Sequence, residues 1–299
     1  MTGRSPKFLR GMLTSAASVM LAGSLLATPF AAQADDRGEP SILTFGIVPQ
    51  QSASRLAQMW GPLLERAGQD LGLEIRFKTT RDIPTFEACL AAGAYDIAYM
   101  NPAHYTIFAE ISGYRAIARQ TEKKLHGLLV VQRDSALQSI ADLEGSEIAF
   151  PSPGAFGASI VPRAEIRAQG VEFSPRYVRS HDSVYRAVAS GLIPAGGGVL
   201  RTFNAIPQDL RDQLRVIYRT EGYTPHAIAG LGSIDLALLR AIQETFVGLS
   251  IETPDLVASV GMNGIEAASH GDWDDVRGLA LTADATGIST EDAAACPSG

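Results

Sequence analysis

The sequence GAYDIAYMNPAHY at residues 93–105 combines a strand and the start of a helix in one short stretch. The run Asp96–Met100 is mostly apolar and aromatic, which favours a buried β-strand. Pro102 follows almost at once, and proline is favoured in the first turn of a helix, where its missing N–H leaves no broken hydrogen bond. A strand that passes directly into a helix is the repeating unit of α/β proteins. We therefore expect an α/β fold.

The same alternation extends over most of the chain. Ile42–Val48 predicts a strand, and apolar residues at helical spacing follow it from Leu56 to Leu71, with Ser52 or Ser54 as the cap. The other predicted strands are Glu74–Thr79, Tyr114–Arg119, Gly127–Gln132, Glu147–Phe150, Arg176–Val178, Ile193–Val199 and Arg215–Tyr218. Strands that alternate with helices predict sheets whose strands are mostly parallel and flanked by helices.

The N-terminal segment is typical of a secretory signal peptide. Three basic residues precede an apolar run at Gly11–Phe30, and Ala32–Ala34 offers the small-x-small pattern of a cleavage site. A membrane anchor is the alternative, but Ser and Thr residues dilute the apolar run. We expect residues 1–34 to be removed and the mature protein to reside in the periplasm.

Composition limits the possible partners. The formal net charge of the 299 residues is −7, and removal of a leader with three basic residues would make it −10. Nucleic acids and anionic membranes favour clustered Lys and Arg, so neither is expected as a partner. A small anionic ligand is not excluded, because a few local donors govern a pocket. The two cysteines, Cys89 and Cys296, suggest no metal site. They could pair in the periplasm, but unpaired thiols are the interpretation we favour.

Five stretches in order resemble the phosphonate/phosphite-binding (PhnD-like) family of periplasmic receptors for ABC importers. They are Phe45–Pro49, Gly93–Tyr105, Asp142–Gly145, Pro151–Gly154 and Ser180–Gly191. The likeness extends from about residue 42 to about residue 280, and it implies the type II periplasmic binding protein fold. That fold is α/β and two-lobed, with a hinge between the lobes.

The length also suits two α/β lobes, the second inserted into the first. We expect lobe one at residues 40–122 plus 223–281 and lobe two at residues 123–222. The crossings near 121–126 and 219–224 would form the hinge. Residues 282–299 have no hydrophobic period, and we expect a disordered tail there. Open α/β sheets bind ligands at the carboxyl ends of their strands, so two such edges would face each other across a cleft.

Candidate ligand-binding residues of lobe one follow the strand that ends at Met100. Asn101, His104 and Tyr105 supply an amide, an imidazole and a phenol at a helix start, groups that can hydrogen-bond an oxyanion. A helix cap at Asn101 and a His104 with internal partners is the structural alternative.

In lobe two, the turn at residues 151–159 departs from the family. The resemblance implies a run of Ser and Thr that holds the phosphonate, whereas this chain has Ala155, Phe156 and Gly157. Backbone amides could still bind an anion there. His181 and Ser183 match the binding segment of the family best. The His181 imidazole would donate either as a protonated ring or as a neutral one.

Two further departures concern the ligand. The resemblance implies acidic residues facing the amine of aminoalkyl phosphonates, and those positions fall near Arg201 and His226. Cationic or neutral groups there would repel an ammonium and attract a second negative charge. We therefore include Arg201 among the ligand-binding residues and expect a compact or doubly anionic ligand.

The sequence thus predicts a monomeric solute-binding protein that delivers a phosphite, phosphate or phosphonate to an ABC permease. A binding module that reports to a membrane sensor kinase is the alternative. We do not expect an enzyme, because no nucleophile motif, metal cluster or dinucleotide-binding glycine signature occurs. No cofactor and no metal are expected.

Overall fold

The computed structural model describes residues 41–288 and Cys296. The predicted signal peptide lies outside these residues, as does most of the predicted tail. Within the described part of the chain, no helix is both long and apolar enough to cross a membrane.

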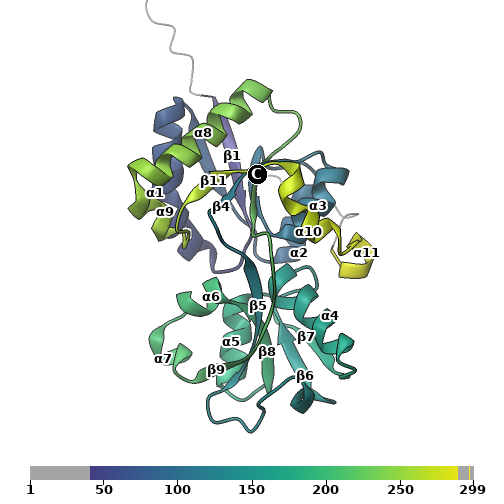
Figure 1. The fold of residues 1–299 in the computed structure, drawn as a ribbon. Coiled ribbons are helices and arrows are strands. Elements are labelled where there is room, and N and C mark those ends of the chain that lie inside the picture. The colour runs from purple at the N-terminus through teal and green to yellow at the C-terminus, as the bar shows by residue number, and fades with distance from the viewer. Residues whose placement is uncertain (1–40, 289–295, 297–299) are drawn as a thin grey trace, which may run out of the picture. The chain divides into compact units, whose positions relative to one another are not determined.

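A six-stranded sheet with order β11-β4-β10-β3-β1-β2 forms the first lobe. Its strands are β1 (Ile42–Ile47), β2 (Glu74–Lys78), β3 (Ile97–Met100), β4 (Arg115–Gln120), β10 (Ala227–Gly230) and β11 (Ile265–Ala267). Its main helices are α1 (Ala53–Leu71), α2 (Ile83–Ala91), α3 (Pro102–Ile111), α8 (Leu236–Glu252), α9 (Pro254–Ser259) and α10 (Asp274–Arg277). Figure 1 shows α1, α8 and α9 on one side of the sheet and α2, α3 and α10 on the other. We call this unit the six-stranded lobe.

A five-stranded sheet with order β7-β6-β8-β5-β9 forms the second lobe. Its strands are β5 (Leu125–Gln132), β6 (Glu147–Phe150), β7 (Ser174–Tyr177), β8 (Ala195–Val199) and β9 (Leu214–Tyr223). Its helices are α4 (Val161–Ala168), which continues a π-helical turn at Phe156–Ile160, and α5 (His181–Ala189), α6 (Leu200–Ala205) and α7 (Gln208–Arg211). We call this unit the five-stranded lobe.

The predicted α/β architecture of two sheets flanked by helices is confirmed, but the strand directions are mixed. In the first sheet β1 runs parallel to β2 and β3, whereas β10 and β11 pair antiparallel with their neighbours. In the second sheet β6 runs parallel to β7 and β8, whereas β5 is antiparallel to both β8 and β9. Strand–helix–strand units give the parallel pairs. β5 and β10, which follow the passages between the lobes, run antiparallel to the strands they pair with, and β11 pairs antiparallel with β4.

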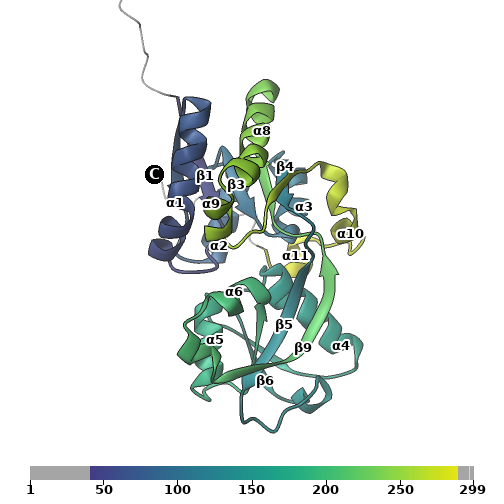
Figure 2. The same cartoon turned by 60° about the vertical axis from the view of Figure 1, so that its left-hand side comes forward.

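Two connections join the lobes. The chain passes from β4 to β5 through residues 121–124 and returns from β9 to β10 through residues 224–226. Figures 1 and 2 show β5 and β9 side by side where they leave the five-stranded lobe. Their ladder runs from Leu125 opposite Tyr223 to Gln132 opposite Leu214.

Aromatic side chains connect the core of the six-stranded lobe to the carboxyl end of its sheet. The ring of Trp60 on α1 lies 5.8 Å from that of Phe45 and 4.8 Å from that of Tyr99, centroid to centroid. Ser52 caps α1 by accepting a hydrogen bond from the N–H of Arg55, as one of the two predicted caps. Packing against the buried face of α1 thereby holds Tyr99 near the carboxyl end of β3.

The C-terminal region differs from the prediction. Residues Ala283–Thr286 form helix α11, where the sequence predicted a disordered tail. Cys89 on α2 forms a disulfide with Cys296, so the interpretation that favoured unpaired thiols is wrong. The two cysteines are 207 residues apart in the chain, a spacing that says nothing about their distance in the fold.

Candidate functional site

A small cavity lies between the two lobes at the carboxyl ends of β1, β3, β6 and β8. We call it the inter-lobe cavity; its lining residues are Val48, Gln50, Ile83, Asn101, Ala155, Phe156, Gly157, Ala158, His181, Val199 and His226. No carboxylate is among them. Its volume is about 10 Å³, which is room for about one water molecule. The described conformation is therefore closed around this site.

The turn at residues 155–158 lines the cavity at the start of a helical segment. Ala155 precedes the helical segment and provides no side-chain cap. The first N–H groups of a helix have no partner within the helix, and they favour an anion. Gly197 of β8 makes this position possible, because a Cβ there would collide with the carbonyl oxygen of Ala158. Phe156 is buried and packs edge-on against Tyr223, with ring centroids 5.4 Å apart.

Asn101 joins the two lobes at the cavity. Its side-chain oxygen accepts a hydrogen bond from the backbone N–H of His104 at 2.9 Å, which caps α3. Its amide nitrogen donates to the carbonyl oxygen of Gly154 at 3.0 Å. The amide nitrogen carries two N–H groups, and it also lies 3.1 Å from Nε2 of His104. Both polar atoms of Asn101 thus have partners within the protein.

His181 brings a buried ring nitrogen without a partner to the cavity. The side chain is 1% exposed, and its Nδ1 lies 3.1 Å from the hydroxyl of Thr202. Its Nε2 has no hydrogen-bond partner among the described residues. Burial, with a smaller contribution from the charge of Arg201, lowers the pKa of His181 to about 3. The imidazole of His181 is therefore neutral in the folded protein near pH 7, and a protonated ring is not supported.

A buried chain of hydroxyl groups can fix the tautomer of His181. The hydroxyl of Tyr185 lies 2.8 Å from that of Thr202, which in turn contacts Nδ1 of the imidazole. The single hydrogen of the Thr202 hydroxyl can donate either to the carbonyl oxygen of Val199, at 3.0 Å, or to Nδ1. Where it donates to Nδ1, the ring proton is on Nε2. In that arrangement Nε2–H is a buried hydrogen-bond donor on a residue that lines the cavity.

Gln50 links two residues on the opposite wall. Its side-chain oxygen accepts a hydrogen bond from Arg201, and its amide nitrogen lies 3.2 Å from Nε2 of His226. Nε2 of His226 is therefore the acceptor, and the ring proton is on Nδ1. His226 stacks on Tyr99 with centroids 5.0 Å apart, and the guanidinium of Arg201 lies 5.5 Å from the same Tyr99 ring. Burial, followed by the charge of Arg201, lowers the pKa of His226 well below its usual range.

The structure brings some of the predicted site residues together and separates others. Asn101, Ala155, Phe156, Gly157 and His181 line the inter-lobe cavity, and Arg201 lies beside it through Gln50. His104, Tyr105 and Ser183 do not line it.

Each of the three separated side chains has another partner. The Nε2 of His104 lies 2.9 Å from the carboxylate of Glu87, inside the six-stranded lobe. The Tyr105 hydroxyl lies 2.9 Å from Nδ1 of His270, and the Ser183 hydroxyl lies 2.9 Å from that of Ser180. For His104 the structural alternative, a histidine with internal partners, describes what is found.

Sequence reasoning missed Gln50 and Tyr99. Gln50 follows the carboxyl end of β1, which is the usual position for a ligand contact in an open α/β sheet. That position was the available signal. Tyr99 lies within β3 and gave no such signal, because a buried aromatic residue in a strand is more often part of the core.

The arrangement is suited to binding a small oxyanion. The imidazole of His181 and the helix start can supply neutral donors, and one cation is adjacent. Among the described residues, no group of three or more His, Cys, Asp or Glu side chains could hold a metal ion.

Sequence comparison places these features in a known context. Residues 45–273 match the model of a family described as periplasmic substrate-binding proteins of phosphonate ABC transporters. The chain is also similar to the phosphate-import protein PhnD of Mycolicibacterium smegmatis, with 24% identity over 178 residues. That match covers 53% of this chain and 55% of the relative, so it spans about half the length of each.

Two solved structures share the fold. One is a binding protein component of an ABC phosphonate transporter from Pseudomonas aeruginosa, with a TM-score of 0.75 and 16% identity over 85% of this chain and 90% of that one. The other is PhnD1 from Prochlorococcus marinus in complex with methylphosphonate, with a TM-score of 0.75 and 15% identity. The second match covers 83% of this chain and all of that one.

Proposed function

The chain belongs to the family of periplasmic phosphonate-binding proteins of ABC transporters, and we propose that it captures a phosphite, phosphate or phosphonate for an ABC importer. The anion would occupy the inter-lobe cavity. The relatives named above are described with phosphate and with methylphosphonate, which supports this ligand class.

The observation that carries the proposal is the unpartnered Nε2 of His181. A buried polar atom without a partner costs free energy of about 1–3 kcal/mol unless something satisfies it. The atom belongs to a residue that lines the inter-lobe cavity, and the other lining residues include a helix start without a side-chain cap and no carboxylate. An oxyanion supplies the missing acceptor for both groups at once.

Ligand access requires the two lobes to separate, because a cavity of about 10 Å³ is too small to admit a phosphonate group. We propose that residues 121–124 and 224–226 act as the hinge. The contact of Asn101 with Gly154 and the contact of Gln50 with Arg201 would break on opening. Small-angle scattering should show a smaller radius of gyration with bound ligand than without. An unchanged profile on confirmed binding would contradict a hinge at these residues.

The site of action follows from the family, whose members work outside the cytoplasm. We propose that cleavage after Ala34 releases a monomeric receptor that acts with an ABC permease and is not itself an enzyme. No observation favours the sensor alternative. An intact mass that begins at Asp35 would support the processing step, and a mature chain that retains residues 1–34 would contradict it.

Isothermal titration calorimetry of the mature protein tests the ligand class. We expect phosphite, phosphate or methylphosphonate to bind with one site per chain and more tightly than sulfate. A mature, folded protein that binds none of the three would contradict the proposal. His181→Ala provides the comparison variant, and its affinity should be at least about tenfold lower, since loss of a hydrogen bond to a charged group costs about 1.5–3 kcal/mol.

A further inference from the structure

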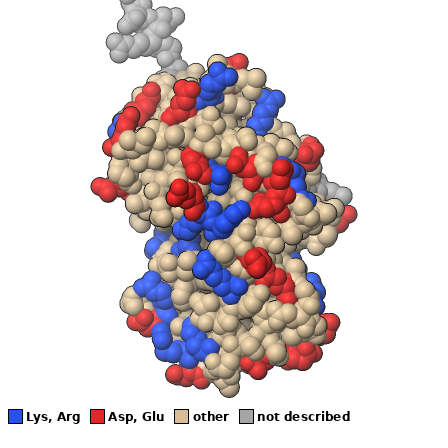
Figure 3. Space-filling model, in the orientation of Figure 1, with Lys and Arg blue, Asp and Glu red and all other residues tan. Residues whose placement is uncertain are grey.

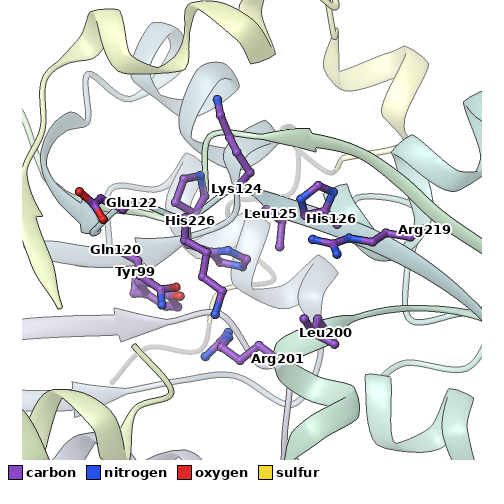
Figure 4. Close-up of a pocket in the computed structure, with 12 residues that line it drawn as sticks. Tyr99, Gln120, Glu122, Lys124, Leu125, His126, Leu200, Arg201, Arg219 and His226 are labelled. Atoms are coloured by element: carbon purple, nitrogen blue, oxygen red, sulfur yellow. The ribbon is translucent and has the colours of Figure 1, made fainter. Parts of the chain in front are cut away.

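A second and larger cavity adjoins the inter-lobe cavity, with His226 lining both. Its volume is about 260 Å³, close to the lower limit for small-molecule sites. It lies against the β4–β5 connection and the start of β5, and Arg201 and Arg219 reach it from the five-stranded lobe (Figure 4). We call it the hinge pocket.

The charge of the hinge pocket is opposite to that of the whole chain. Four cations, Lys123, Lys124, Arg201 and Arg219, line it together with one carboxylate, that of Glu122. The chain as a whole carries a net charge of −7. Figure 3 shows Lys and Arg side chains gathered across the middle of the same face, where the two lobes meet.

Three of these cations have no counter-ion among the residues that the structure describes. Lys124 pairs with Asp275 at 2.8 Å. Within the described part of the chain, Lys123, Arg201 and Arg219 have no carboxylate within 4.0 Å of their nitrogens. Mutual repulsion among unpaired cations opposes their gathering, so an anion that enters the pocket would relieve it.

A buried amide also points to a ligand. Gln120 at the end of β4 lines the hinge pocket and is 6% exposed, yet its Nε2 has no hydrogen-bond partner among the described residues. Beside it the guanidinium of Arg201 is held over the Tyr99 ring, which limits its freedom before any ligand arrives. The pocket therefore contains both an unsatisfied donor and positioned charge.

We propose that the hinge pocket binds a second anionic group of the ligand. This inference rests on the proposed function, in which the phosphorus oxyanion occupies the inter-lobe cavity. The substrate class is then a phosphonate or phosphate ester whose organic part ends in a carboxylate or a second phosphoryl group. An ammonium at the same place would meet three unpaired cations, so aminoalkyl phosphonates are disfavoured.

Calorimetry with three matched compounds tests the proposal on the mature protein. They are methylphosphonate, 3-phosphonopropionate and 2-aminoethylphosphonate, which share the head group and differ in the tail. We expect 3-phosphonopropionate to bind at least about tenfold more tightly than methylphosphonate, because several partly exposed charge contacts together are enough for about a tenfold change in affinity. We expect 2-aminoethylphosphonate to bind more weakly than both.

Variants assign the preference to the pocket. In Lys123→Gln/Arg219→Gln the preference for 3-phosphonopropionate over methylphosphonate should fall to about threefold or less, as expected when two such contacts are lost. The control Arg240→Gln, at an exposed position on α8, should leave it unchanged. Equal affinities of the wild type for methylphosphonate and 3-phosphonopropionate, or a preference for the amine, would overturn this inference alone. If none of the three compounds binds, and neither phosphite nor phosphate binds, the proposed function would be overturned together with this inference.

Discussion

Arg201 on α6 donates a hydrogen bond to the side-chain oxygen of Gln50, the residue that follows β1 by three positions. A cation of one lobe is thereby bonded to an amide of the other beside the proposed ligand site. The same guanidinium lines the hinge pocket, and its charge adds to burial in lowering the pKa of His181 and of His226. Arg201 thus both joins the two lobes and supplies positive charge beside the proposed ligand site.

Replacement of Arg201 should therefore weaken anion binding strongly. Loss of one partner of a desolvated charge pair costs about 2–5 kcal/mol, or roughly 30-fold or more in affinity. We expect Arg201→Ala to bind 3-phosphonopropionate at least that much more weakly, as measured by calorimetry. Arg240→Ala, at an exposed position on α8, is the matched control and should bind like the wild type. Equal affinities for Arg201→Ala and the wild type would remove Arg201 from the site.

Thr202→Val tests whether the buried hydroxyl chain orients His181. The substitution removes the partner of Nδ1, so the tautomer is no longer fixed. We expect a loss of about 1–3 kcal/mol in the free energy of unfolding, because a buried polar atom loses its hydrogen bond. Methylphosphonate affinity should also fall. Tyr185→Phe leaves the contact of Thr202 with His181 in place and should have a smaller effect on affinity. A Thr202→Val protein that binds methylphosphonate like the wild type would refute the idea that the buried hydroxyl chain orients His181.

Stability should depend on the two buried histidines in mildly acidic solution. The folded state lowers the pKa of His181 to about 3 and that of His226 well below its usual range, from an ordinary value of 6.5. Below pH 6.5 the unfolded chain binds protons that the folded chain excludes. The free energy of unfolding should therefore fall as the pH is lowered, by up to about 1.4 kcal/mol per pH unit for each histidine.

Urea unfolding at several pH values between 7.5 and 4.5 measures this dependence. His181→Gln and His226→Gln should each show a shallower decline than the wild type, because each removes one titrating group. Carboxylates contribute to the slope in all three proteins alike, so the difference between the slopes isolates the histidines. Identical slopes in the wild type and both variants would contradict the buried neutral state.

The disulfide should stabilise the six-stranded lobe. A cross-link that closes a loop of 207 residues restricts the unfolded chain, and loss of a native disulfide typically costs about 2–5 kcal/mol. We expect Cys296→Ser to lower the thermal midpoint, measured by circular dichroism. Reduction should lower the midpoint of the wild type and leave that of Cys296→Ser unchanged. Two free thiols detected by mass spectrometry in the secreted protein would show that the bond does not form.

Much of the fold was predictable because its strands are apolar and separated by helices of clear periodicity. Two short strands, β10 and β11, escaped prediction. β10 consists of Ala-Ile-Ala-Gly, which carries little β-propensity, and its place in the sheet comes from pairing with β3 and β4. Tertiary pairing of this kind leaves no local pattern in the sequence.

The site was predictable only to the level of strand ends. Asn101 was predicted because it follows a strand at a helix start, and His181 because it matches the binding segment of the family; both line the cavity. His104 also begins a helix, but its side chain turns inward to Glu87, which is itself buried. The direction of a side chain in the first helical turn depends on packing around it, and Gln50 shows the reverse case, since it reaches the site from a loop.

Native mass spectrometry of the mature protein mixed with methylphosphonate tests the central claim most directly. The claim is that a phosphorus oxyanion binds between the lobes through Nε2 of His181. We predict one methylphosphonate per chain on the wild type and little or none on His181→Ala at the same concentrations. His181→Ala that retains the ligand as well as the wild type, or a wild type that retains none, would contradict the account.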